Sequence, residues 1–157
     1  MTDVAIEKNV KYVLSVGDNI YFTGVSNEYD SRFQGPSDVE KAEKQWKWIA
    51  KNLNSNRADY LFVAGHYPIH SASSHGPTRC LQERLDPLLK ATNVSAYFAG
   101  HDHTLQHIVY PGVAGHEIHY VLSGAASRSD RSKANINTIS GRSLKFRLKY
   151  PHRKTEV

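Results

Sequence analysis

The stretch AYFAGHDHTLQHI, Ala96–Ile108, joins a short apolar run to a glycine and then to three histidines. His101 and His103 lie on either side of Asp102, and His107 follows later in the same stretch. An apolar run of this length that ends at a glycine is typical of a buried β-strand. Two interpretations of the histidines are open. They are polar residues of an ordinary loop, or the strand delivers imidazole ligands to a metal ion.

Apolar runs and amphipathic stretches alternate on either side of this segment. Four runs have the length and composition of buried strands: Lys11–Val16, Tyr60–Gly65, Ser95–Gly100 and Ile118–Gly124. Ser37–Leu53 predicts a helix, because it opens with a capping box and repeats apolar residues every three or four positions. Thr78–Ala91 predicts a second helix that bends or ends near Pro87. This alternation indicates an α/β fold with parallel strands and crossover helices.

Side chains that can bind metals follow three of the predicted strands. Asp18 and Tyr21 follow the first strand, His66 follows the second, and His101 and His103 follow the third. The glycine before each group lets the backbone turn sharply. Because ligands in α/β sheets bind at the carboxyl ends of strands, we expect these five residues to meet at one edge of the sheet.

The mixture of donors narrows the kind of metal site. Imidazole suits zinc, iron, copper and nickel, and a carboxylate such as Asp18 can bridge two ions. The phenolate of Tyr21 would favour a hard ion such as ferric iron, because its pKa of about 10 has to be lowered before it binds. Two ions about 3.5–4 Å apart would stabilise the attacking and leaving oxygens of a phosphoester. The donors therefore indicate a dinuclear centre for phosphate chemistry.

The composition describes one ordinary folded domain with a basic end. The chain has 157 residues, of which 39% are hydrophobic and 22% are charged. The net charge of +5 gathers in residues 141–157, where Lys and Arg oppose a single acid, Glu156. Such a run is usually a solvated surface, and nucleic-acid binding is the alternative. We expect a domain over residues 1–124 and a polar linker with a basic segment over 125–157. No apolar run is long enough for a membrane-spanning helix.

Three motifs resemble a known family: GDNIYFTGV, AGHYPIHSASSHGPTRCLQERLDPLL and AYFAGHDHTLQHI. They are similar to the purple acid phosphatases of the tartrate-resistant type, within the calcineurin-like metallophosphoesterases. The resemblance runs from about Val10 to Gly124. It implies that residues 1–124 form part of an αββα sandwich. It also implies acid hydrolysis of phosphate monoesters, by hydroxide attack at a dinuclear centre of Fe(III) and a divalent iron, zinc or manganese ion.

The resemblance assigns a role to each expected metal ligand. Asp18 would bridge the two metals, and Tyr21 would bind the ferric ion together with His103. His66 and His101 would bind the divalent ion. Two imidazoles one residue apart would then face different metal ions.

Other polar residues near these motifs have expected roles as well. His75, in SSHGPTRC, matches a histidine of the family that positions the substrate or protonates the leaving group. Asp102 lies between two expected ligands, so we expect it to orient them or to cap the turn. The remaining histidines of the central region match no ligand and are expected in loops or on the surface: His70, His107, His116 and His119.

The chain also departs from the family pattern. It lacks an N-terminal Gly-Asp-x-Gly motif, whose aspartate is a ferric ligand. It also lacks a Gly-Asn-His motif, whose asparagine binds the divalent ion and whose histidine aids catalysis; this motif is expected where Gln34 runs into Gly35. Each metal then keeps all but one of its expected protein ligands. Cys80 matches a cysteine that is disulfide-bonded in the family, and its partner falls in a missing stretch. We therefore expect a shortened family member.

Three functions remain open from the sequence. The first is an acid phosphatase, the second is a non-catalytic remnant that binds a metal or a partner, and the third is a basic nucleic-acid-binding module, which is the least favoured. The compartment is also open. Members of the family are typically secreted or lysosomal, whereas the start MTDVAIEKNVKYV lacks the layout of a signal peptide.

Overall fold

The computed structural model of the chain describes residues 36–125, 130–139 and 146–149, and the side chains of residues 42–125 and 130–139. The predicted strand Lys11–Val16 lies outside these residues. The described helices are α2 (Pro36–Ser55), α3 (Arg79–Arg84) and α4 (Asp86–Ala91). The described strands are β1 (Phe62–Ala64), β2 (Ala96–Ala99), β3 (Leu105–Pro111), β4 (Glu117–Ser123) and β5 (Phe146–Lys149). Short 3-10 turns occupy Val113–Gly115 and Ile136–Thr138.

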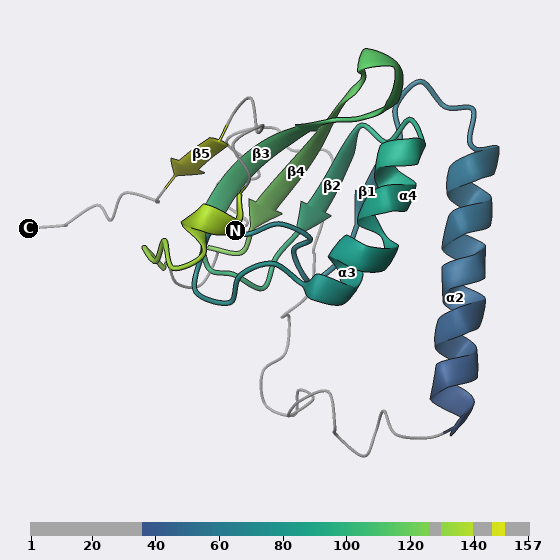
Figure 1. Cartoon of the computed structure of the whole chain (residues 1–157), viewed down its shortest axis with the longest axis horizontal. Helices are drawn as coiled ribbons and strands as arrows, with labels where there is room; N and C mark the ends of the chain where they lie inside the picture. The colour runs from purple at the N-terminus through teal and green to yellow at the C-terminus, as the bar shows by residue number, and fades with distance from the viewer. Residues whose placement is uncertain (1–35, 126–129, 140–145, 150–157) are drawn as a thin grey trace, which may run out of the picture.

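The five strands form one sheet in the order β1-β2-β4-β3-β5 (Figure 1). β2 is parallel to both β1 and β4, so the predicted α/β fold with parallel strands is confirmed. β3 and β5 are additional to the predicted strands, and β3 runs antiparallel to both β4 and β5. The fourth predicted strand therefore lies between a parallel and an antiparallel neighbour. β5 belongs to the segment that was predicted as a linker and basic end.

The helices follow the predicted pattern closely. α2 covers the predicted helix Ser37–Leu53 and extends it at both ends. The second predicted helix is divided at Leu85 into α3 and α4. Pro87 lies in the first turn of α4, where a proline ring and its missing N–H are tolerated. The predicted break near Pro87 is thus confirmed.

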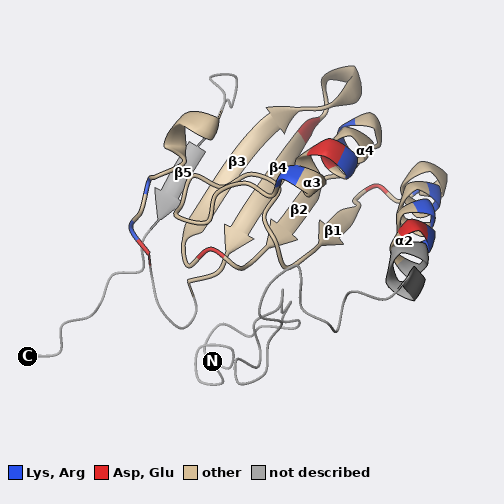
Figure 2. Ribbon diagram, turned by 60° about the horizontal axis from the view of Figure 1, so that its bottom comes forward, with Lys and Arg blue, Asp and Glu red and all other residues tan. Residues whose placement is uncertain are grey.

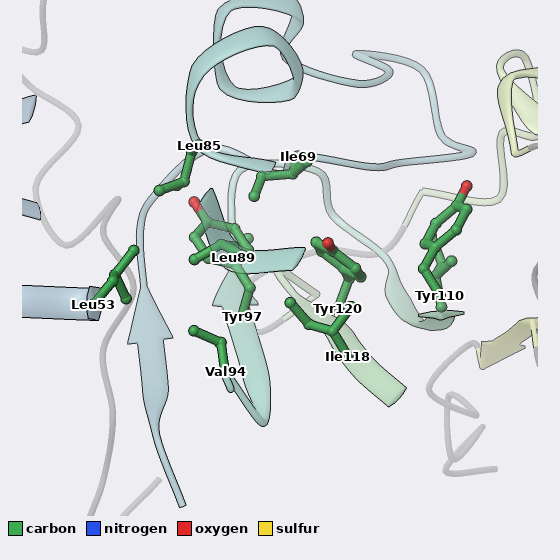
Figure 3. Packing of buried hydrophobic residues seen from close by; sticks show 11 residues of the cluster. Leu53, Ile69, Leu85, Leu89, Val94, Tyr97, Tyr110, Ile118 and Tyr120 are labelled. Atoms are coloured by element: carbon green, nitrogen blue, oxygen red, sulfur yellow. The ribbon is translucent and has the colours of Figure 1, made fainter. Parts of the chain in front are cut away.

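The apolar core lies between α3, α4 and one face of the sheet (Figures 1 and 3). Leu89 of α4 and Val94 are fully buried against strand residues such as Tyr97 and Ile118. Since successive side chains of a strand point to opposite faces, alternate residues of β2 and β4 supply this core. The cluster consists of Leu53, Ile69, Leu85, Leu89, Val94, Tyr97, Ala99, Ile108, Tyr110, Ile118 and Tyr120.

A buried carboxylate on α4 also joins the helices to the sheet. Asp86 is 6% exposed. Its carboxylate accepts a hydrogen bond from the hydroxyl of Tyr120 and another, at 2.6 Å, from the ammonium group of Lys90. Burial opposes the ionisation of Asp86, but the interactions with His70, Lys90 and Tyr120 outweigh it and lower its pKa. Burial raises the pKa of Tyr120, so its phenol stays protonated and donates. Asp86 therefore acts as a charged acceptor between α4 and β4.

The four histidines without an expected ligand role are not all loop or surface residues. His70 is buried, and its Nε2 lies 3.4 Å from Asp86 Oδ2 without hydrogen-bond geometry. His107 of β3 and His119 of β4 are half-buried neighbours, with 2.7 Å between Nε2 and Nδ1. The expectation of a loop or surface position is therefore wrong for His107 and His119, which lie in strands, whereas His70 does lie in a loop, the one after β1, but is buried there. His116 is half-buried, with Nε2 2.9 Å from the carbonyl oxygen of Val94.

Charged side chains gather on the helices, whereas strands β1 to β4 carry few (Figure 2). α2 is tied to α3 at this charged surface, where Arg84 donates two hydrogen bonds to Glu43, at 2.8 and 3.1 Å. The same guanidinium lies 4.6 Å from the centre of the Trp46 ring. Among the described residues, no helix has both the length and the apolar composition needed to cross a membrane.

Candidate active site

The carboxyl ends of β1 and β2 bring two of the expected ligands together. The strands are parallel, and their backbone hydrogen bonds continue past the last strand residues: Gly65 N–H donates to Phe98 O and Gly100 N–H donates to His66 O, both at 3.0 Å. The ring centres of His66 and His101 consequently lie 5.1 Å apart, with the rings nearly perpendicular. Both side chains are half-buried. Two imidazoles at this spacing can approach a common ion.

Two more rings complete this cluster. The ring centre of His75 lies 4.6 Å from that of His101, and His75 itself is exposed to solvent. The ring centre of Tyr67 lies 4.6 Å from that of His101 and 4.8 Å from that of His66. The cluster therefore combines two half-buried imidazoles with one that solvent and a ligand can reach.

His101 adopts a backbone conformation that ordinary residues avoid. Its φ angle is 63°, in the left-handed region, which costs a residue with a side chain about 1–2 kcal/mol. Strained residues of this kind occur preferentially at functional sites, where the surrounding structure holds them. Gly124 contributes to holding this turn, because a Cβ at Gly124 would collide with the carbonyl oxygen of Asp102. The strain makes the turn after β2 the strongest candidate for a functional element.

A glycine–tyrosine contact sets the position of the loop after β1. A Cβ at Gly65 would collide with the hydroxyl of Tyr97, which donates a 2.8 Å hydrogen bond to Tyr67 O. Burial raises the pKa of Tyr97 to about 12, so this phenol remains a donor. The contact therefore requires glycine directly before His66.

Asp102 connects the two loops. Its side chain is fully buried, and it accepts hydrogen bonds from Ser71 Oγ and, at 3.1 Å, from the backbone N–H of His75. Gln106 lies beside it, where its amide donates to Ser71 Oγ at 3.0 Å and its carbonyl accepts Ala72 N–H at 2.9 Å. The expectation was that Asp102 orients His101 and His103 or caps the turn, whereas the bonds of its carboxylate go to Ser71 and His75 of the other loop.

The segment after β4 also holds the loop that carries His75. The hydroxyls of Ser73 and Ser74 donate to Asp130 at 3.1 and 2.6 Å, and these bonds and those of nearby backbone N–H groups lower the Asp130 pKa. Asn135 donates to Ser73 O at 2.6 Å. Residues 130–139, which belong to the predicted polar linker, thus pack against the loop that carries His75.

The structure brings together three of the six predicted site residues, namely His66, His101 and His75. His103 belongs to the same turn as His101, and its carbonyl oxygen accepts the N–H of Asp130 at 2.7 Å. Asp18 and Tyr21 lie outside the described residues. Within the described part of the chain, no group of three or more His, Cys, Asp or Glu side chains has a geometry that could hold a metal ion. The two neighbouring imidazoles fit a metal site only as part of a larger ligand set.

Several residues of this network are absent from the sequence prediction. Ser71, Gln106, Asp130 and Asn135 act through hydrogen bonds that join segments far apart in the chain. The serines between His66 and His75 are the one sequence feature that could have indicated a hydrogen-bonded loop. Nothing in the sequence indicated its partners.

A separate groove lies at the opposite ends of the same strands. Its volume is about 950 Å³, and its lining includes Tyr60, Phe62, Ser95 and Ala96, which precede or begin β1 and β2. None of the predicted site residues lines it. We therefore place the candidate site at the carboxyl ends of the strands, where the strained turn and the histidines are.

Comparison with known proteins finds relatives over most of the chain. Residues 1–105 match the family of calcineurin-like phosphoesterases. The chain is 39% identical to human tartrate-resistant acid phosphatase type 5 over 141 residues, which cover 89% of this chain and 42% of that protein. It is also 39% identical to purple acid phosphatase 17 of Arabidopsis thaliana over 95 residues, which cover 60% of this chain and 27% of that protein. The chain thus spans about two fifths of the length of its tartrate-resistant relatives.

A solved structure shows the same fold. It is titled GAP50, the anchor in the inner membrane complex of Plasmodium, and it superposes with a TM-score of 0.51 at 24% sequence identity. The similarity covers 69% of this chain and 32% of that one. At this identity the likeness concerns the fold alone, and it supports an α/β arrangement of the metallophosphoesterase kind.

Proposed function

We propose that this chain, which belongs to the calcineurin-like phosphoesterase family, is an acid phosphatase-type hydrolase of phosphate monoesters that depends on a metal centre. The observation that carries the proposal is the pairing of His66 and His101 at adjoining parallel strand ends, with His101 held in a strained conformation. Homology to purple acid phosphatases implies a dinuclear metal centre, and the family implies a phosphate ester substrate.

The proposed centre combines Fe(III) with a divalent iron, zinc or manganese ion. His66 and His101 would bind the divalent ion. Tyr21 and His103 would bind the ferric ion, and Asp18 would bind both ions. When bound, the two ions would supply positive charge to the phosphoryl oxygens and acidify a water molecule. Hard carboxylate and phenolate donors with borderline imidazoles suit this pair of ions.

His75 is the residue proposed to act on the substrate itself. Its imidazole is exposed and lies beside His101, so a phosphate ester bound at the two strand ends would meet it. A protonated imidazole can donate a hydrogen bond to a phosphoryl oxygen or a proton to the leaving alcohol. This chemistry needs no nucleophilic serine or cysteine.

The test combines metal analysis with an assay on one preparation. The purified chain is loaded with iron, analysed for metal content and visible absorbance, and assayed with para-nitrophenyl phosphate at mildly acidic pH. We expect bound metal, a tyrosinate–iron band and turnover, and we expect loss of turnover in His66→Ala and Asp18→Ala. His116→Ala is the matched control, since His116 bonds to Val94 O and matches no ligand. Turnover that persists in both His66→Ala and Asp18→Ala would contradict the proposal.

A second outcome of the same experiment would favour a different function. Bound metal without hydrolysis of any phosphate monoester would indicate a non-catalytic, metal-binding member of the family.

A further inference from the structure

We infer that Asp102 is a positioning residue that holds His75 beside His101, an inference that rests on the function proposed above for His75. Asp102 follows His101 directly in the chain, and its carboxylate accepts the backbone N–H of His75 at 3.1 Å. One side chain therefore links two histidines that come from loops after different strands. The ring centres of these histidines lie 4.6 Å apart.

The directions of the hydrogen bonds require a carboxylate at this position. Ser71 Oγ already accepts two bonds, from Gln106 Nε2 at 3.0 Å and from Ser73 N–H at 3.2 Å. A hydroxyl has two acceptor sites and one proton, so the Ser71 proton is left for Asp102. The second oxygen of Asp102 faces another donor, the N–H of His75. Each oxygen of Asp102 thus accepts a hydrogen bond from its own donor.

The neighbouring amide is also fully used. Both hydrogens of Gln106 Nε2 have acceptors, Ser71 Oγ and Thr104 Oγ1, and Gln106 Oε1 accepts Ala72 N–H at 2.9 Å. Gln106, Asp102 and Thr104 are buried, so no water competes for these groups. Both hydrogens of the Gln106 amide and both oxygens of Asp102 thus have partners. The loop that carries His75 is fixed relative to the turn that carries His101.

The substitution Asp102→Asn keeps the shape of the side chain but replaces one acceptor oxygen with an NH₂ group. That group must face either the Ser71 hydroxyl or the His75 N–H, and both are donors. We expect the loop to shift, so that the imidazole of His75 moves away from His101. Asp130→Asn is the matched control, because Asp130 also binds hydroxyls of the same loop but makes no bond to His75 N–H.

The first measurement is nuclear magnetic resonance on the full chain without added metal, with the histidine rings labelled. In the wild type and in Asp130→Asn we expect ring-to-ring contacts between His75 and His101. In Asp102→Asn we expect these contacts to disappear while the amide signals of β2 and β4 stay in place. Retention of the ring contacts in Asp102→Asn would overturn the inference. This result is independent of turnover, so it is distinguishable from failure of the proposed function.

The second measurement uses the metal-loaded chain. We expect Asp102→Asn to lower kcat/KM about 10- to 100-fold, the range for residues that orient groups of a metal site. In a His75→Ala background, the same change should have a much smaller effect, because the residue it positions is gone. Equal effects in both backgrounds would contradict a role through His75. If Asp102→Asn fails to fold, Asp102→Ala, which removes both acceptor oxygens and places no NH₂ group against the two donors, is measured in the same way, and retained ring contacts would again overturn the inference.

Discussion

The contact between Gly65 and Tyr97 places a hydroxyl where any other residue would carry its Cβ. Gly65→Ala should therefore push Tyr97 aside or shift the loop that begins with His66. Overpacking of this kind in a core typically lowers the free energy of unfolding by about 1–3 kcal/mol. Urea unfolding of the variant would measure this loss.

Tyr97→Phe supplies the control for this prediction. Without the hydroxyl, the nearest ring atom to the added Cβ is 3.3 Å away, a tight contact in place of a collision. The cost of Gly65→Ala should thus be clearly smaller in the Tyr97→Phe background. An equal cost in both backgrounds would show that backbone conformation, and not the hydroxyl, requires the glycine.

At this scale the sequence predicts which histidines approach each other but not what holds them. Glycine-terminated parallel strands bring His66 and His101 to one edge, and that pattern is visible in the sequence. The left-handed conformation of His101 and the hydrogen bonds of Asp102 depend on loop shapes that no local pattern encodes. The partners of Asp102, Ser71 and His75, precede it by about thirty residues.

The element α4 is joined to β4 by the Asp86–Tyr120 hydrogen bond, which should make its docking depend on pH. The folded-state pKa of Asp86 lies below its unfolded value of about 3.9. The stabilisation is therefore fully present above that unfolded value and is lost as the pH falls through the lowered folded pKa. Asp86→Asn should lower the free energy of unfolding by about 1–3 kcal/mol at pH 6 and by less at acidic pH.

Urea unfolding at pH 6 and near pH 3 tests this dependence. Glu83→Gln is a suitable control, because Glu83 forms only an exposed pair with Arg79 within α3. This change should have little effect at either pH. An equal loss of stability for Asp86→Asn at both pH values would contradict the assignment of the effect to the charge.

The helix α2 is the element most weakly joined to the rest of the described structure. Among its described side chains only Leu53 is buried, and Trp46 and Ile49 are partly buried against the core. Arg84 adds an exposed ion pair with Glu43 and a contact with the Trp46 ring. Exposed ion pairs contribute little to the free energy of unfolding, and salt screens them. In hydrogen exchange, α2 should lose protection before β2 and β4, and Arg84→Ala should lower the protection of α2 alone. Arg79→Ala is the control, and exchange of α2 as slow as that of β2 would contradict the prediction.

Helices and strands with a clear pattern of apolar residues were predictable from the sequence, and those without such a pattern were not. The apolar repeat of α2, the break at Pro87 and the apolar runs of β1, β2 and β4 follow from local rules. β3 was hidden because its buried positions include Gln106, which lies among the polar contacts of the site. β5 lies in a basic segment, and only its pairing with β3 makes it a strand. Tertiary contacts decide both cases.

At the scale of the whole molecule, the proposed metal centre should couple metal binding to stability. An ion that binds the folded chain and not the unfolded one stabilises it by RT ln(1 + [L]/Kd), which is about 2.7 kcal/mol at a concentration of 100 Kd. For a chain of this size, that free energy raises the Tm by about 5–10 °C. Thermal unfolding with increasing iron or zinc would measure the shift, and a chelator should reverse it.

The site variants make this prediction specific to the proposed ligands. His66→Ala and His101→Ala should each reduce the shift in Tm, because each removes an imidazole from the pair at the strand ends. His116→Ala should leave the shift unchanged, since its imidazole faces Val94 O. An equal shift in all of these variants would mean that the metal binds elsewhere on the chain. A shift confined to the wild type and the control would show that the paired histidines bind metal in the chain as it stands, whether or not it hydrolyses phosphate.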